Sequence, residues 1–202
     1  MRPGNNITRA EVSTIFFRLL RDEIRAEALT ESNDFSDVAE GSWYNTAIST
    51  MTNLSYLTGY PDGTFMPNQF ITRAEFATVA ARFDTSTFAG DNRFSDIEGH
   101  WAADAINRAA QRGWLTGYPD GTFMPDQFIT RAEAITLINR VLGRDRILAG
   151  GMHPGMVTWS DNPPGTWYHT AIQEATNSHG FVRDAAGYEI WTDIRPNRDW
   201  SN

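Results

Sequence analysis

Residues 57–75 read LTGYPDGTFMPNQFITRAE, and residues 115–133 read LTGYPDGTFMPDQFITRAE. The two stretches differ only at Asn68, which is Asp126 in the second copy. A shorter third copy, PGNNITRAE, occupies residues 3–11. Such segments indicate a repeat protein, in which each unit buries its apolar side chains against a neighbouring unit.

A second motif alternates with the first and joins an aromatic-Ser-Asp start to a Trp-x-x-x-Ala-Ile segment. The copies read FSDVAEGSWYNTAI from Phe35, FSDIEGHWAADAI from Phe94 and WSDNPPGTWYHTAI from Trp159. Their apolar positions are spaced as on one face of a helix. This spacing favours a core position for the three tryptophans over an exposed one: Trp43, Trp101 and Trp167.

Between the two helical motifs lies a turn followed by a helix start. Residues 59–64 carry Pro-Asp-Gly, which is typical of a tight turn because proline presets one dihedral angle and glycine tolerates positive φ. Thr72 and Glu75 then form a capping box, and Ile71 and Phe76 fit the hydrophobic staple that accompanies it. Each unit is therefore predicted to be a helix–hairpin–helix.

We predict a mainly α fold, with three helix–hairpin–helix repeats in a pseudo-threefold arrangement and strands no longer than short hairpin arms. Residues 1–202 form one domain. Residues 35–83 and 94–142 are complete repeats, residues 1–34 are the second half of a repeat, and residues 159–202 are a first half with a degenerate hairpin. We expect residues 159–202 to close the unit of residues 1–34, with the Trp167 helix against the Thr8 helix; loss of an upstream half-repeat is the alternative.

An arginine follows the capping threonine in every copy: Arg9, Arg73 and Arg131. The first helical position should point away from the helix's own core, and the cap does not require an arginine. A guanidinium can hold a carboxylate through two parallel hydrogen bonds, and a helix N-terminus adds backbone N–H groups. These arginines are candidate anion-binding residues; a surface arginine paired with a nearby carboxylate is the alternative.

Composition excludes several other classes of function. The net charge is −8, which argues against nucleic-acid binding because a phosphate backbone demands a basic surface. The chain has no cysteine and no apolar run of the ~18–20 residues that span a bilayer, so neither disulfides nor membrane insertion are expected. Met1–Gly4 lacks the apolar core of a secretory signal, so we expect any export signal to lie outside these residues.

Catalytic and metal motifs are also missing from the sequence pattern. No phosphate-binding glycine loop and no nucleophile elbow occurs. The four histidines fall in no zinc-ligand spacing, so the sequence predicts no metal site, no cofactor and no enzyme. They are His100, His153, His169 and His179.

The ordered motifs Phe-Ser-Asp, Trp-x-x-x-Ala-Ile, Gly-Tyr-x-Asp-Gly-Thr-Phe and Ile-Thr-Arg-Ala-Glu resemble the S-layer homology family over nearly the whole chain. The resemblance implies three prongs around a central helical bundle. It implies an extracellular, non-catalytic module that anchors a surface protein to the cell wall of Gram-positive bacteria. The partner would be a secondary cell-wall polysaccharide with a pyruvylated amino-sugar end, and the cargo would lie outside these residues. A structural or host-facing protein-interaction module is the alternative.

The resemblance also implies site residues. Arg9, Arg73 and Arg131 match the family's best-known functional position. Arg9 is expected to matter least, because its own unit lacks the Tyr-Pro-Asp-Gly-Thr hairpin. Tyrosines of the hairpin and two tryptophans are candidates for contact with sugar faces, and the hairpin aspartates are turn formers first and ligand contacts second. These further candidates are Tyr60, Tyr118, Trp43, Trp101, Asp62 and Asp120.

Overall fold

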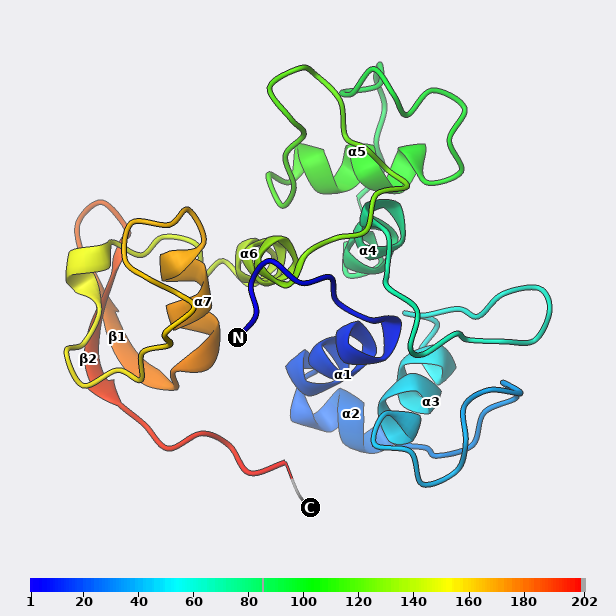
Figure 1. Cartoon of the computed structure of the whole chain (residues 1–202), viewed down its shortest axis with the longest axis horizontal. Coiled ribbons are helices and arrows are strands. Elements are labelled where there is room, and N and C mark those ends of the chain that lie inside the picture. The colour runs from blue at the N-terminus through cyan, green and yellow to red at the C-terminus, as the bar shows by residue number, and fades with distance from the viewer. Residues whose placement is uncertain (85, 201–202) are drawn as a thin grey trace. The chain divides into compact units, whose positions relative to one another are not determined.

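The computed structural model describes residues 1–84 and 86–200 (Figure 1). Thr85 and the last two residues of the predicted 159–202 segment lie outside the described residues. The chain divides into two compact units, one of residues 6–111 and 117–129 and one of residues 1–5, 112–116 and 130–202. The first unit holds α1 (Arg9–Leu19), α2 (Asp22–Ala28), α3 (Asn45–Asn53), α4 (Arg73–Ala81) and α5 (Ala103–Gln111). The second unit holds α6 (Arg131–Val141), the 3-10 turn η1 (Ala149–Gly151), α7 (His169–Thr176), β1 (His179–Arg183) and β2 (Glu189–Ile194).

The prediction of a mainly α, three-pronged helical bundle is wrong. Helices make up 33% of the chain and extended residues 9%, so the fold mixes α and β structure. β1 and β2 form an antiparallel hairpin with a register shift between Gly180 and Phe181. These strands are longer than the short hairpin arms expected, because residues 179–194 are rich in β-branched and aromatic side chains that favour strands.

The helix caps and turns that the sequence motifs predict are present in the structure. Thr8, Thr72 and Thr130 each accept a hydrogen bond from the backbone N–H of the glutamate three residues later, and that glutamate accepts one from the threonine N–H. Gly63 and Gly121 both have φ of 83°, the left-handed conformation that the Pro-Asp-Gly turn requires.

The helices pack in pairs. α1 packs against α3, α4 against α5, and α6 against α7. Each capped helix therefore buries its apolar face against the tryptophan-motif helix that follows it in the chain. The Trp167 helix, α7, packs against α6, and its expected pairing with the Thr8 helix stays a prediction. An apolar stripe specifies that a face is buried but not which neighbour buries it.

Three isoleucines join the repeat copies inside the first unit. The backbone N–H of Ile7 donates to Ile129 O at 3.3 Å, that of Ile71 to Ile7 O at 3.1 Å, and that of Ile129 to Ile71 O at 3.1 Å. These hydrogen bonds close a ring, and all three side chains are buried. The residue that precedes each capping threonine therefore connects the three copies of Ile-Thr-Arg-Ala-Glu through the backbone.

An aromatic cluster packs α1 against α4 in the same unit. Phe16 lies 5.7 Å from Phe76 and 5.2 Å from Phe83, measured between ring centroids. Phe83 also stacks on Tyr56 at 4.3 Å with an angle of 4° between the ring planes. Because Tyr56 directly precedes the repeated 57–75 segment, this stack fixes the hairpin relative to the two helices.

The aspartate of each aromatic-Ser-Asp motif holds the far end of a hairpin. Asp37 accepts hydrogen bonds from the backbone nitrogens of Phe65 and Met66, both at 2.8 Å. Met66 has φ of 55°, so the carboxylate supports a backbone conformation that is unfavourable for a residue with a side chain. The same bonds join Asp96 to Phe123 and Met124, and Asp161 to Met1 and Arg2.

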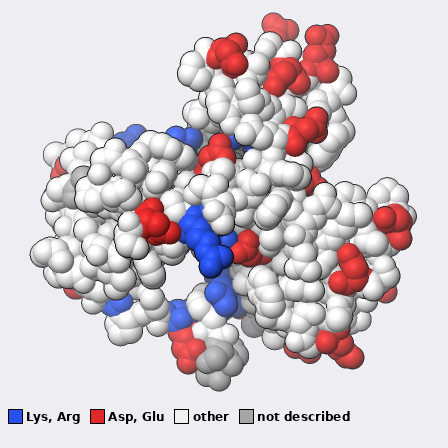
Figure 2. Space-filling view, viewed as in Figure 1, with Lys and Arg blue, Asp and Glu red and all other residues white. Residues whose placement is uncertain are grey.

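The surface carries the excess of acidic residues. Figure 2 shows aspartate and glutamate side chains at several separate places on one face, with fewer basic side chains. Within the described part of the chain, no helix is both long and apolar enough to span a bilayer.

Candidate functional site

Arg9 is buried, with 7% of its surface exposed, and reaches into the hairpin of the next repeat. Its Nε donates to Phe65 O at 2.8 Å, its Nη1 to a Glu75 carboxylate oxygen at 2.7 Å, and its Nη2 to Thr58 O at 3.1 Å. The guanidinium also lies 4.7 Å from the centroid of the Tyr60 ring. The side chain leaves its own helix as expected, but it is buried because it fastens the hairpin to α1.

Arg73 repeats this arrangement with the second hairpin. It is 8% exposed, its Nε donates to Phe123 O at 2.8 Å, and its guanidinium lies 4.9 Å from the Tyr118 ring. Arg131 instead donates from Nε to Met1 O at 3.0 Å. Arg9 therefore has a Tyr-Pro-Asp-Gly-Thr hairpin beside it and Arg131 does not, so the reason for ranking Arg9 last is wrong.

The N-termini of the capped helices are already bonded to the protein. In α1, Arg9 N donates to Gln69 O at 2.9 Å, Ala10 N to Pro67 O at 2.9 Å, and the next amide to the Thr8 hydroxyl at 3.2 Å. Equivalent backbone bonds hold α4 and α6. The expected contribution of unbonded helix N–H groups to an anion site is therefore wrong, and side chains must supply the hydrogen-bond donors.

A pocket of about 170 Å³ in the first unit brings several predicted residues together. Arg9, Tyr60 and Trp101 line it together with residues of α4. The other lining residues are Leu57, Thr58, Gly59, Phe65, Ile71, Glu75, Thr78, Val79 and Arg82. The pocket thus combines two arginines, a phenol, a carboxylate and an indole.

Tyr60 acts as a hydrogen-bond donor in this pocket. Its hydroxyl donates to a Glu75 carboxylate oxygen at 2.7 Å. Burial and this hydrogen bond raise the pKa of Tyr60 to about 12, with Arg9 opposing the shift. The phenol therefore stays protonated at neutral pH. Glu75 accepts hydrogen bonds from Tyr60, from Arg9 and from the backbone nitrogen of Thr72.

Arg82 is a pocket residue that the sequence reasoning missed. Its Nη1 donates to Tyr56 O at 2.9 Å, and burial lowers its pKa. No carboxylate of the described residues forms an ion pair with it. The missed signal is a second arginine at the same place in every capped helix, as Arg18, Arg82 and Arg140.

The predicted core position of the tryptophans is wrong. Trp43, Trp101 and Trp167 are 64%, 65% and 64% exposed, whereas the Ala47 and Ile48 that follow Trp43 are 2% and 0% exposed. The helix buries its Ala-Ile face and leaves the indole outside. In the second unit, Trp167 lines a pocket of about 190 Å³ together with Arg140 and Arg144.

The hairpin aspartates have a structural role within their turns. Asp62 accepts hydrogen bonds from the backbone nitrogen and the hydroxyl of Thr64, at 3.0 and 2.7 Å, and Asp120 does the same with Thr122. These bonds lower the pKa of both exposed carboxyls. Neither aspartate lines the Arg9 pocket.

A second hollow of the first unit, of about 550 Å³, is polar and has no arginine in its wall. Its walls come from the segment before Phe35, from α3 and from Thr58 and Gly59. Hydroxyl and amide side chains there could meet a neutral sugar, but an anionic group would find no cation. The Arg9 pocket is therefore the better candidate for an acidic ligand.

Comparison with known proteins defines the class of the chain. Residues 34–77 and 93–135 match the S-layer homology domain. These two segments, which include the Thr72 and Thr130 caps and both hairpins, are S-layer homology repeats. Such domains are non-catalytic anchoring modules.

Similar proteins in bacteria carry the same region. The chain is 38% identical over 200 residues to the cellulosome-anchoring protein of Acetivibrio thermocellus, a match that covers 94% of this chain and 42% of that protein. It is 36% identical to cell surface glycoprotein 1 of the same organism, over 90% of this chain and 8% of the relative. It is 33% identical to exoglucanase XynX of A. thermocellus, over 72% of this chain and 14% of the relative.

The chain therefore spans less than half the length of these relatives, one of which is named as an enzyme. The shared region is a cell-surface anchoring module located at the cell wall.

Proposed function

We propose that this chain anchors a surface protein by binding a cell-wall polysaccharide, and that the Arg9 pocket is a binding site. The observation that carries the proposal is the convergence of Arg9, Arg82, Tyr60 and the exposed Trp101 on one pocket. The relative named as a cellulosome-anchoring protein supports the anchoring role.

The chemistry of the pocket favours an acidic sugar. Glu75 compensates the charge of Arg9, whereas Arg82 has no carboxylate partner among the described residues and can pair with a ligand anion. A carboxylate such as that of a pyruvylated sugar fits a guanidinium through two hydrogen bonds. The exposed Trp101 offers a flat apolar face to a sugar ring. Because the protein is acidic as a whole, attraction must come from such local arginines.

The equivalent positions extend the proposal. Arg73 lies over Tyr118 as Arg9 lies over Tyr60, so the second hairpin offers the same arginine–tyrosine pair. Trp43 has the same exposure as Trp101. Arg131 lacks a hairpin tyrosine, and we place it, with Asp62 and Asp120, behind these residues as ligand contacts.

We also propose that the two ends of the chain belong to one degenerate third repeat. Asp161 accepts hydrogen bonds from the nitrogens of Met1 and Arg2 as Asp37 does from Phe65 and Met66. Arg131 donates to Met1 O as Arg9 does to Phe65 O. Residues 1–5 therefore occupy the place of a hairpin end in the second unit.

Binding to purified cell walls tests the function. The chain should bind native sacculi and lose most of that binding to sacculi stripped of their secondary polysaccharide. Equal binding to both preparations would reject the polysaccharide and favour the alternative, a module that binds proteins of the surface or of a host. The cargo, which we expect outside these residues, does not enter this experiment.

A further inference from the structure

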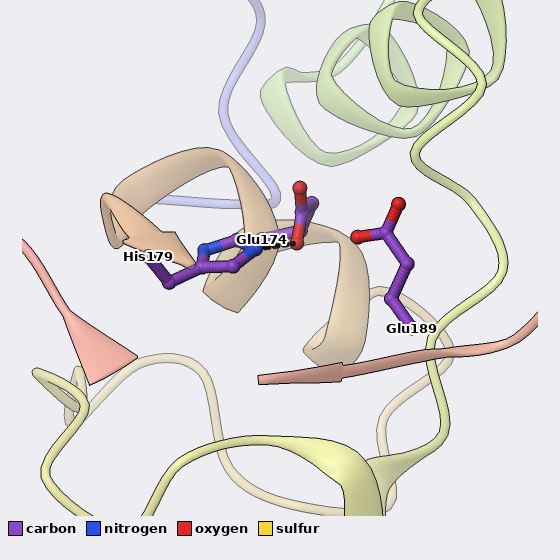
Figure 3. A group of neighbouring side chains, drawn as sticks. All are labelled: Glu174, His179 and Glu189. Carbon is purple, nitrogen blue, oxygen red and sulfur yellow. Dashed lines mark ion pairs between the residues drawn. The ribbon is translucent and has the colours of Figure 1, made fainter. Parts of the chain in front are cut away.

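Glu174, His179 and Glu189 form a buried cluster in the second unit, outside the pockets described above. Glu174 lies on α7, His179 begins β1 and Glu189 begins β2. Figure 3 shows the His179 ring and the Glu189 carboxylate on opposite sides of Glu174. One ligand atom from each residue lies within 4.8 Å of the other two. Glu174 and Glu189 are 4% and 1% exposed, and the His179 side chain is 6% exposed.

The hydrogen bonding of His179 fixes which ring nitrogen faces the carboxylates. Nδ1 lies 2.7 Å from Asn177 O, and a carbonyl oxygen only accepts, so Nδ1 carries a proton. In the neutral ring, Nε2 then presents its lone pair to a Glu174 oxygen 3.3 Å away. The lone pairs of Nε2 and of the ionised carboxylate repel each other at this distance. A metal ion or a proton between the two atoms would remove this repulsion.

The hydrogen bonds of Glu189 are a second observation that points to a bound cation. One of its oxygens accepts from Arg183 Nη2 at 2.7 Å. The other, Oε2, is buried without a hydrogen-bond partner among the described residues. A buried, unpaired carboxylate oxygen is costly, which favours a cation at this position.

We propose that Glu174, His179 and Glu189 bind one divalent transition-metal ion of the zinc type. An imidazole nitrogen with two carboxylate oxygens suits zinc and its neighbours, whereas calcium and magnesium prefer oxygen ligands alone. The Asn177 carbonyl accepts from Nδ1 and so orients the imidazole, as the hydrogen-bond partners of metal-binding histidines do. His179 also stacks on Trp191, at 3.9 Å between ring centroids with 15° between the ring planes.

Such an ion would join α7 to both strands of the hairpin. Zinc bonds of about 2.0–2.1 Å place tetrahedral ligands ~3.4 Å apart. His179 Nε2 and the Glu174 oxygen already lie 3.3 Å apart, so any closing movement that a zinc ion requires involves Glu189. Three protein ligands leave a fourth position for water or for another ligand. This hairpin lacks the Pro-Asp-Gly-Thr turn of the other repeats, so a metal bond would supply a local constraint that the turn supplies elsewhere.

The experiment uses the full chain after treatment with EDTA and removal of the chelator. Titration with zinc chloride in a calorimeter should show one ion per chain, and Co²⁺ should give the visible absorption of a tetrahedral site. His179→Gln and Glu189→Gln should each lower zinc affinity at least ~10-fold, because even the loss of a hydrogen bond to a metal ligand costs about that much. His153→Gln, at a histidine of the same unit outside the cluster, should bind zinc like the parent.

Stability gives a second readout. Zinc at about 100 times its dissociation constant should lower the unfolding equilibrium constant ~100-fold, or about 2.7 kcal/mol, in the parent and not in His179→Gln. Absence of zinc binding in the parent would overturn the proposal and leave a proton between His179 and Glu174 as the cation. Equal zinc affinity in all variants would overturn it as adventitious binding. If His179→Gln fails to fold, Glu174→Gln replaces it, and the parent's cobalt spectrum alone still decides whether a tetrahedral site exists.

Discussion

The guanidinium of Arg9 lies 4.7 Å from the centroid of the Tyr60 ring, although the two residues belong to different copies of the sequence repeat. Glu75 accepts hydrogen bonds from both side chains. The arginine therefore closes a buried network between α1, a hairpin and α4. Any ligand contact that it makes comes in addition to this structural role.

Removing Arg9 should destabilise the protein. Arg9→Ala removes the cation paired with Glu75 and the donor of two carbonyl oxygens, and breaking a buried ion pair costs about 3–5 kcal/mol. The measurement is the free energy of unfolding in urea, with Arg93→Ala as an exposed control that should stay within ~0.5 kcal/mol of the parent. Unchanged stability in Arg9→Ala would show that these bonds contribute nothing. Loss of polysaccharide binding in this variant would not by itself identify a ligand contact.

Substitution of the exposed Trp101 in the pocket should weaken binding without lowering stability. Trp101 is 65% exposed, so Trp101→Ala should keep the parent melting temperature and weaken polysaccharide binding roughly tenfold, the effect expected of an aromatic contact. Calorimetric titration with purified polysaccharide measures this effect. Leu29→Ala, which removes a 56% exposed apolar side chain elsewhere, should bind like the parent. Undiminished affinity in Trp101→Ala would remove the indole from the proposed site.

Arg82 should contribute the charge that the ligand requires. Arg82→Ala should weaken polysaccharide binding by about 2–5 kcal/mol, the range for a buried charge contact. Arg82→Lys should restore binding only in part, because an ammonium lacks the two-pronged geometry of a guanidinium. The same calorimetric titration compares both variants with the parent. Full affinity in Arg82→Ala would mean that the ligand's anion is held elsewhere.

Asp37 should be as important to the fold as a core residue. Asp37→Ala removes the acceptor of two backbone N–H groups and the support for the positive φ of Met66. The free energy of unfolding should fall by about 2–4 kcal/mol, since hydrogen bonds to charged groups contribute ~1.5–3 kcal/mol each. Glu40→Ala, at an exposed position of the same loop, is the matched control. Equal unfolding midpoints for the two variants would contradict this role.

The capping threonine should have a smaller effect. Thr72→Ala removes the acceptor for the Glu75 N–H and should lower the free energy of unfolding by about 1 kcal/mol. Thr72→Ser keeps the hydroxyl and should retain most of that stability. Chemical denaturation of the two variants gives the comparison, and a Thr72→Ser that is as unstable as Thr72→Ala would assign the effect to the methyl group instead.

Tyr60 should make stability sensitive to alkaline pH. Its pKa in the folded protein is about 12, against the ordinary tyrosine value of 10.0, so the unfolded chain loses the phenol proton first. The stabilisation is therefore complete below pH 10 and is lost as the pH rises through 12. The difference in unfolding free energy between the parent and Tyr60→Phe, measured from about pH 9 to 12, should shrink with pH. Tyr188→Phe controls for loss of an exposed hydroxyl, and a difference that stays constant with pH would contradict the assignment.

Local structure followed from the sequence by itself. The capping boxes at Thr8, Thr72 and Thr130 and the turns at Gly63 and Gly121 formed where the motifs placed them. These features depend on residues that are close in the chain, so their geometry is decided by local backbone preferences and hydrogen bonds. The recurrence of the motifs also identified the family of the two complete repeats.

Only the tertiary structure decided which repeat supplies each neighbour. Arg9 enters the hairpin of a different copy, Trp101 lies outside its helix rather than in the core, and α7 pairs with α6. The pairing of Glu174 with His179 and Glu189 also depends on a hairpin whose sequence departs from the repeat. A helical period marks the face that is buried, but it carries no information on the partner that buries it. That choice depends on how all of the apolar faces and backbone hydrogen bonds are satisfied together.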